Sequence, residues 1–134
     1  MKNDKEKNLK ILLLGNEASG KTCIITRYTK GKFEDMGYKT HSPSYSSKSI
    51  NIGNKSINLD IWDTPGSERL RDLVKLFYKD ANAIVLVYDI TNKYYFDDLK
   101  NYWYSKLKKN LPKEASKKKL KYIKIDISNY TSWK

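Results

Sequence analysis

Short apolar runs and alternating segments recur along the chain and predict the strands of a sheet. Two of the runs are almost wholly apolar, which is typical of strands buried on both faces. Apolar and polar residues alternate on either side of Gly53-Asn54, which predicts a hairpin with a two-residue turn. The predicted strands are residues 9–14, 50–52, 57–61, 83–88 and 120–127.

Segments with helical spacing separate these strands. Residues 21–30 suit a helix, and residues 70–78 could form a second one. A third helix should end before Pro112 and carry on one face the apolar residues Phe96, Leu99, Trp103 and Leu107. Residues 31–49 lack apolar periodicity and begin as a long loop, and such loops are usually functional. Because strands alternate with helices, the pattern predicts an α/β fold built from parallel βαβ units.

The length and composition of the chain indicate one globular domain. It has 134 residues, of which 39% are hydrophobic, so it can build a core. The apolar runs are far too short to span a bilayer, and the charged extension formed by residues 1–8 does not resemble a secretory signal. Its one cysteine, Cys23, cannot form an intramolecular disulfide, which fits a reducing, cytoplasmic compartment.

Positive charge is concentrated near the C-terminus. The formal net charge of the chain is +12, and residues 105–134 alone hold ten lysines against two acidic residues. A basic segment of this kind could bind RNA or an acidic lipid surface. The alternative is that these lysines only face water, as most charged runs do.

The strongest chemical signal is a phosphate-binding loop that follows the first predicted strand. The residues that match GxxxxGK[ST] are Gly15, Asn16, Glu17, Ala18, Ser19, Gly20, Lys21 and Thr22. Two glycines let the backbone turn its N–H groups inward, and the following helix adds its positive N-terminus. Lys21 should reach the β- and γ-phosphates of a nucleotide, and the hydroxyl of Thr22 should bind Mg²⁺.

A second chemical element follows the third predicted strand, where Asp63 and Gly66 flank Thr64-Pro65. A carboxylate at this edge of an α/β sheet lies where such sheets bind ligands. We expect Asp63 to hold Mg²⁺ through a water molecule. We expect the N–H of Gly66 to approach a γ-phosphate, because no Cβ intervenes.

These motifs resemble the Ras superfamily of small GTPases, and its Rab branch most. The similar segments are residues 59–69, 77–78 and 84–91, and the resemblance extends over residues 9 to about 127. It implies the three-layer sandwich of P-loop NTPases, with a mostly parallel sheet and one antiparallel hairpin. On this reading residues 1–134 form a single domain that lacks the C-terminal part of the fold, including the last strand and helices.

The resemblance also implies a function and assigns residues to it. Such a protein binds GTP or GDP with Mg²⁺ and hydrolyses GTP as a molecular switch, typically in vesicle traffic. Thr40 would be the switch I threonine that binds Mg²⁺ beside Thr22 and Asp63, and the nucleotide site would extend to Cys23 and Asn129. Lys21, Gly66 and Ser67 would form the catalytic part.

The same resemblance implies partners and a location. Effector, exchange-factor and activating proteins would bind the switch regions, where effectors meet the aromatic residues Tyr45, Trp62 and Phe77. We expect a monomer in the cytoplasm or at the surface of endomembranes, with no DNA partner. The prenylated C-terminal cysteines of Rabs have no counterpart, so no lipid anchor is expected from this sequence.

Several positions depart from the family pattern. Ser42 stands where Rabs have a glycine that touches the γ-phosphate, and Pro43 stiffens the loop after it. Glu17 brings a carboxylate close to the phosphates, which is unfavourable unless its side chain turns outward. The glutamine that positions the attacking water is replaced by Ser67, so hydrolysis should be slow. Of the base-recognition motif NKxD only Asn129 remains, so guanine selectivity should be weak.

Two other functions remain open from the sequence. The chain could be a non-catalytic GTPase relative or fragment that acts through its effector-like surface, or a basic protein that binds RNA or acidic lipid. Cys23 is more simply a packed residue than a reactive thiol, and His41 has no second metal ligand at suitable spacing.

Overall fold

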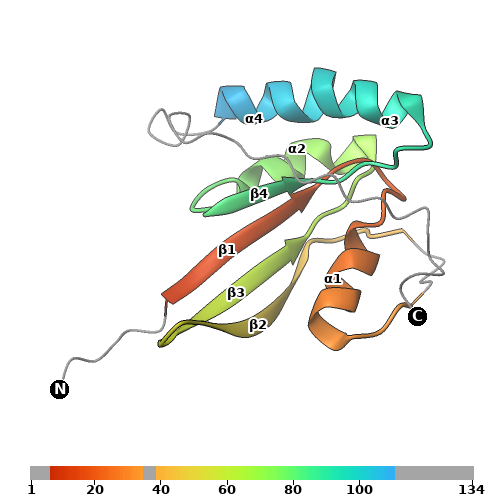
Figure 1. Cartoon of the computed structure of the whole chain (residues 1–134). Coiled ribbons are helices and arrows are strands. Elements are labelled where there is room, and N and C mark those ends of the chain that lie inside the picture. Colours follow the sequence, from red (N-terminus) through yellow and green to blue (C-terminus); the bar gives the residue numbers. More distant parts are fainter. Residues whose placement is uncertain (1–6, 35–38, 111–134) are drawn as a thin grey trace.

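The computed structural model describes residues 7–34 and 39–110, which contain a four-stranded sheet with helices on both faces (Figure 1). The spatial order is β2-β3-β1-β4. Strand β1 pairs in parallel with β3 and with β4, whereas β2 and β3 form an antiparallel hairpin. The strands are β1 (Lys7–Leu14), β2 (Ser44–Ile52), β3 (Lys55–Asp63) and β4 (Ala83–Leu86). The predicted α/β class, with one antiparallel hairpin in a mostly parallel sheet, is confirmed.

Helix α1 (Lys21–Lys30) covers one face of the sheet, and the other helices cover the opposite face (Figure 1). The short helix α2 (Arg71–Val74) lies between single 3₁₀ turns. Helix α3 (Lys93–Asp98) continues through the π-helical residues Leu99–Tyr104 into α4 (Ser105–Asn110). These layers form the three-layer sandwich that the family resemblance implied.

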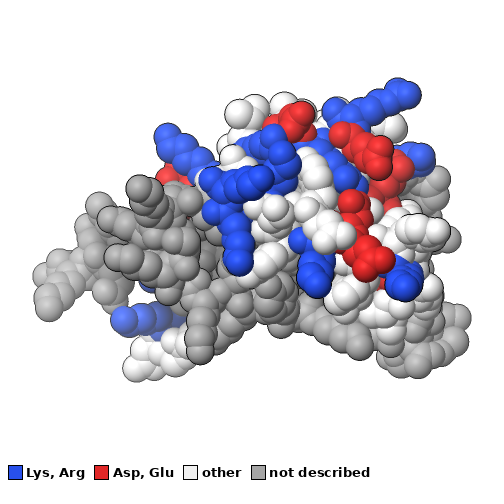
Figure 2. Space-filling view, turned by 90° about the horizontal axis from the view of Figure 1, so that it is seen from above, with Lys and Arg blue, Asp and Glu red and all other residues white. Residues whose placement is uncertain are grey.

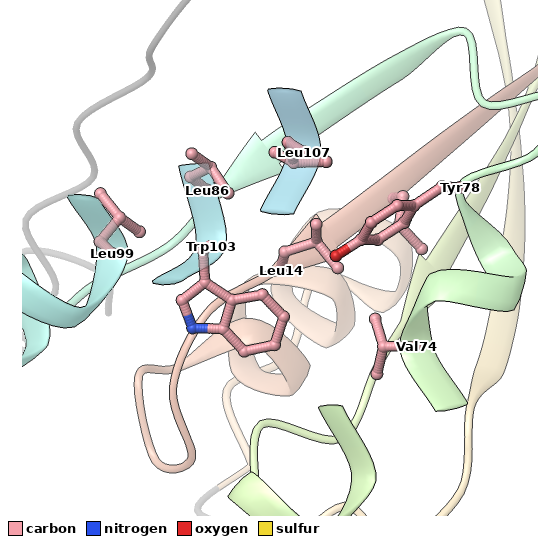
Figure 3. Packing of buried hydrophobic residues seen from close by; sticks show 8 residues of the cluster. Leu14, Val74, Tyr78, Leu86, Leu99, Trp103 and Leu107 are labelled. Carbon is pink, nitrogen blue, oxygen red and sulfur yellow. The ribbon is translucent and has the colours of Figure 1, made fainter. Parts of the chain in front are cut away.

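Each face of the sheet contributes to its own hydrophobic core. Beneath α1, Ile25 packs with Leu13 and Leu59. On the other face Trp103 and Leu107 are fully buried with Leu14 (Figure 3). Alternate residues of β1 thus point into different cores, which is why its sequence is apolar without interruption from Ile11 to Leu14.

The strands of the hairpin are longer than the sequence indicated. Strand β2 begins at Ser44, inside the predicted 31–49 loop, because its backbone pairs with β3 as far as Asp63. The side chain of Lys48, a polar residue of β2, extends toward α1, where its Nζ donates a hydrogen bond to the carbonyl of Tyr28 at 2.6 Å. The boundary prediction was wrong here because main-chain pairing does not require apolar side chains.

Two smaller boundaries and the burial of one residue also differ. Strand β1 starts at Lys7, so the last two residues of the predicted 1–8 extension pair with β3. Strand β4 ends at Leu86 rather than at residue 88. Phe96 is 48% exposed and contacts Tyr88, with ring centroids 5.5 Å apart, instead of joining the buried face of its helix. The predicted strand 120–127 and Asn129 lie outside the described residues.

Within the described part of the chain, no helix has both the length and the apolar character needed to cross a membrane.

Candidate functional site

The phosphate-binding loop joins the end of β1 to the start of α1, at the edge of the sheet where the parallel strands end (Figure 1). Gly15 has φ +154°, and a Cβ there would lie 2.0 Å from the carbonyl oxygen of Val87. Gly20, with φ +94°, starts α1 in a left-handed conformation. Both positions therefore require glycine for steric and conformational reasons.

Lys21 lies in the interior of this loop. Its side chain is buried, and its Nζ donates hydrogen bonds to the carbonyls of Gly15 at 3.0 Å and Asn16 at 2.8 Å. Burial lowers the pKa of Lys21 to about 8, although the carboxylates of Asp63 and Glu17 act in the opposite direction. The loop thus holds a cation at its centre, where backbone carbonyls fix its position.

Three oxygen-bearing side chains meet beside Lys21, as the sequence and the resemblance predicted. The hydroxyl of Thr22 donates to Oδ2 of Asp63 at 2.5 Å and lies 2.9 Å from the hydroxyl of Thr40. Asp63 is 5% exposed, and burial raises the pKa of its carboxyl group. Among the described residues its Oδ1 has no hydrogen-bond partner although it is buried.

This set of donors fits Mg²⁺. Hydroxyl and carboxylate oxygens are the ligands that this ion prefers, and it is commonly held by one or two protein groups together with phosphate oxygens. A divalent cation would also stabilise the ionised form of Asp63, which burial alone disfavours. Thr22, Thr40 and Asp63 are therefore suitably arranged to hold the ion.

Gly66 lies directly against the phosphate-binding loop. A Cβ at Gly66 would be 2.3 Å from the backbone nitrogen of Glu17 and 2.4 Å from the carbonyl carbon of Asn16. The segment that follows Asp63 can therefore pass over the loop only because residue 66 has no side chain. Ser67 comes next and lines a cavity of about 760 Å³ at this junction.

Glu17, which was the least expected residue of the loop, forms an ion pair with Lys39 at 3.1 Å. Lys39 directly precedes Thr40, so this pair joins the phosphate-binding loop to the segment that contains Thr40. Both side chains are partly exposed, so the pair adds little stability by itself. The neighbouring cation nevertheless balances the negative charge of Glu17 near the site.

The remaining predicted residues lie around the site or outside it. Cys23 is half-buried, and its thiol approaches the carbonyl of Glu34 with an Sγ to O distance of 3.7 Å. His41 lines the cavity beside Ser67, and no cluster of three potential metal-ligating side chains from His, Cys, Asp or Glu occurs in the described ranges. The predicted contact of Asn129 with the base lies outside the described residues.

The three predicted effector-binding aromatics form one stack across β2, β3 and the turn after α2. Trp62 lies between Tyr45 and Phe77, with ring centroids 5.2 Å apart in both pairs. Tyr45 is 61% exposed, and the ammonium of Lys10 lies 5.3 Å from the ring centroid of Trp62. The structure thus brings together side chains from three segments that are distant in sequence.

Sequence reasoning missed the role of the Asn16 side chain. Its Nδ2 donates to Oδ2 of Asp98 at 2.6 Å, and its Oδ1 accepts a hydrogen bond from Nε1 of Trp103 at 2.9 Å. Arg71 forms an ion pair with the same carboxylate of Asp98. The sequence gives no spacing signal for this cluster, because Asn16 and Trp103 are 87 positions apart.

Comparison with known proteins agrees with this geometry. A model of the Ras family matches residues 10–132 of the chain. Over 107 residues the chain is 43% identical to human "Ras-related protein Rab-21", which covers 80% of this chain and 47% of that protein. It is 40% identical over 105 residues to "Ras-related protein Rab-24" of Dictyostelium discoideum, which covers 78% of this chain and 51% of the relative.

A third relative is "Ras-like GTP-binding protein RYL2" of Yarrowia lipolytica, which is 39% identical over 102 residues, 76% of this chain and 48% of that protein. The chain thus spans about half the length of the curated relatives it matches. The family assignment rests on the family match and on these identities, and it agrees with the arrangement of Lys21, Thr22 and Asp63. The chain belongs to the Ras family and is Rab-like.

Proposed function

We propose that this chain binds GTP and GDP with Mg²⁺ and hydrolyses GTP slowly, as a molecular switch. The observation that carries the proposal is the meeting of three oxygen donors, from Thr22, Thr40 and Asp63, beside the buried ammonium of Lys21. Phosphate groups and a divalent cation are the ligands that satisfy such an arrangement together. The family to which the chain belongs supports the same function.

Each part of the site has a distinct role in this proposal. The backbone N–H groups of residues 15–22 and the N-terminus of α1 bind the phosphates, and Lys21 neutralises the β- and γ-phosphates. Thr22, Thr40 and Asp63 hold Mg²⁺, which supplies positive charge to the phosphate oxygens. Cys23, in the first turn of α1, lies at the margin of the same site.

Hydrolysis is an in-line attack of water on the γ-phosphate. We propose that the N–H of Gly66 approaches the γ-phosphate, because this residue lies against the backbone of Asn16 and Glu17. The side chain of Ser67 is too short to orient the attacking water as a glutamine does, so the intrinsic rate is low. Lys21, Gly66 and Ser67 are the residues that we assign to the catalytic step.

For the base we propose a reduced preference for guanine. The contacts that bind the phosphates come from residues 15–22, whereas of the NKxD motif only Asn129 is present. A site that lacks the carboxylate for the guanine edge loses most of its ability to reject adenine. Competition of labelled GDP by GTP and by ATP measures this preference directly, and a guanine preference of family strength would contradict it.

The aromatic stack of Tyr45, Trp62 and Phe77, of which Tyr45 is exposed and the other two are partly buried, is the surface that we propose for effector, exchange-factor and activating proteins. Lys108 and Lys109 lie at the end of α4, and Figure 2 shows Lys and Arg side chains on this side of the molecule together with Asp and Glu side chains. An acidic membrane surface would be attracted to this face. Together these surfaces support a role in vesicle traffic, in the cytoplasm and at endomembranes.

A titration with fluorescent GDP and GTP, with and without Mg²⁺, tests the proposed function. We expect saturable binding that weakens when Mg²⁺ is removed, and a weaker Mg²⁺ effect in Thr22→Ala. Thr29→Ala is the matched control, because Thr29 lies in the same helix and its hydroxyl donates a hydrogen bond to the carbonyl of Ile25, within that helix.

Two results would contradict the proposal. The absence of nucleotide binding by the wild-type chain would favour an interaction module that acts through the aromatic stack. Binding of RNA or acidic vesicles that disappears with added salt, without nucleotide binding, would favour a polyanion-binding protein.

A further inference from the structure

The side chains of Asn16, Arg71, Asp98 and Trp103 form a cluster beside the phosphate-binding loop. The four residues come from the loop, α2, α3 and the π-helical stretch. We call these residues the Asp98 cluster. Trp103 is fully buried, packs with Leu14 and Val74 (Figure 3), and the side chain of Arg71 is only 10% exposed.

The hydrogen bonds of the Asp98 cluster specify an amide at position 16. The indole N–H of Trp103 can only donate, and the carboxylate of Asp98 can only accept. The Asn16 amide offers one oxygen and one NH₂ group, and it meets both neighbours, at 2.9 and 2.6 Å. A carboxylate at position 16 would instead face the carboxylate of Asp98, and an apolar residue would leave the indole N–H without this acceptor.

Asp98 holds two segments with one oxygen atom. Its Oδ2 accepts a hydrogen bond from Asn16 and also forms the ion pair with Arg71, while Nη1 of Arg71 lies 3.4 Å from Oδ1. The guanidinium is stacked 4.3 Å from the ring centroid of Tyr102, which restricts its orientation. The carboxylate thereby joins the phosphate-binding loop to α2.

Both joined segments contact the proposed nucleotide site through their backbones. The carbonyl of Asn16 holds the ammonium of Lys21 at 2.8 Å. Gly66, five residues before Arg71, rests against the backbone of Asn16 and Glu17. Displacement of Asn16 would therefore move both the ammonium of Lys21 and the backbone against which Gly66 rests.

We propose that Asp98 is a positioning residue that couples the phosphate-binding loop to the segment 66–74. Through Asn16 it fixes the carbonyl that orients Lys21, and through Arg71 it keeps Gly66 against the loop. This inference rests on the proposed function, because the coupling matters only if the loop binds phosphates. Asp98 itself touches neither phosphate nor metal in this scheme.

The test compares Asp98→Asn with Asp97→Asn in the full chain. Asp97 is the adjacent, exposed carboxylate on the same helix, so it is the matched control. An amide in place of the Asp98 carboxylate can no longer offer a charged oxygen to both neighbours, and we expect fluorescent GDP to dissociate about tenfold faster from Asp98→Asn. We expect the release rate of Asp97→Asn to equal that of the wild type.

Hydrogen exchange separates coupling from simple loss of stability. In the wild type, GDP should slow amide exchange both in residues 15–22 and in residues 66–74. In Asp98→Asn, this slowing should be lost in residues 66–74 and weakened in residues 15–22, while elements away from the cluster, such as β2, exchange as in the wild type. A merely structural role would lower the melting temperature and speed exchange in β2 as well.

A double variant provides the rescue. Asn16→Asp alone places two carboxylates face to face and should also speed GDP release, whereas Asn16→Asp with Asp98→Asn exchanges the amide and the carboxylate. The exchanged pair restores the contact between residues 16 and 98 and an acceptor for Trp103, so release from the double variant should be slower than from Asn16→Asp.

The outcomes are distinct. Wild-type release rates in Asp98→Asn, or nucleotide-dependent protection of residues 66–74 that survives in it, would overturn the inference. If the wild-type chain binds no nucleotide, the proposed function fails, and exchange without nucleotide decides whether Asp98 joins the segments. If amide exchange is then faster in residues 15–22 and 66–74 of Asp98→Asn, and is unchanged in both segments of Asp97→Asn, Asp98 joins the two segments. Unchanged exchange in Asp98→Asn would refute this.

Discussion

Replacement of Lys21 by methionine is the most direct test of the phosphate site. The substitution keeps the unbranched stem and removes only the ammonium of a residue that is 5% exposed and bonded to the carbonyls of Gly15 and Asn16. These carbonyls accept two of its three N–H groups, and the third lies 3.4 Å from the hydroxyl of Ser19. A phosphate needs to replace only this longest of the three contacts, so the ammonium is already held in place for binding.

The size of the effect follows from the burial of this cation. Truncation of one partner in a buried, hydrogen-bonded charge pair costs about 2–5 kcal/mol. A loss of about 4 kcal/mol raises the dissociation constant about a thousandfold. Lys21→Ala should have at least this effect, because it also removes the stem and leaves space in the loop.

The assay is fluorescence anisotropy of labelled GDP in the presence of Mg²⁺. Lys30→Met is the control, because Lys30 is an exposed lysine in the last turn of the same helix. Thermal unfolding without nucleotide checks that each variant is folded. A folded Lys21→Met protein that binds GDP within about threefold of the wild type would refute the assignment of Lys21 to the phosphates, since a loss of about a thousandfold is expected.

Three further predictions concern the rate and the stability of the protein. Ser67→Gln should raise single-turnover GTP hydrolysis about tenfold or more, because the longer amide can orient the attacking water; an unchanged rate would mean that another residue limits the step. Leu107→Ala should lower the free energy of unfolding by about 2–5 kcal/mol in urea, because Leu107 is 0% exposed, whereas Leu76→Ala, at a side chain that is 71% exposed, should change it little. Burial raises the pKa of Tyr78 from 10.0 to about 12, so the folded state retains a proton that the unfolded chain loses in this range and stability should fall as pH rises from 10 to 12. Tyr78→Phe should remove this part of the pH dependence, and identical pH profiles of the melting temperature would contradict the assignment.

The sequence by itself determined the features whose residues are neighbours along the chain. The position of the loop of residues 15–22 was predicted, because its glycines, Lys21 and Thr22 form one continuous motif between an apolar strand and a helix. The order of the described strands and helices followed from the spacing of apolar residues, which is also a property of neighbouring positions. The boundary of β2 was wrong, because its pairing with β3 depends on a backbone partner that the side-chain pattern does not show.

Only the tertiary structure decided which distant side chains meet. The ion pair of Glu17 with Lys39 depends on where the segment before Thr40 returns to the site. The link from Asn16 to Asp98 crosses 82 positions and depends on how α3 packs on the sheet. Side-chain hydrogen bonds form between groups that folding brings within about 3 Å, and no local propensity of the chain encodes that proximity.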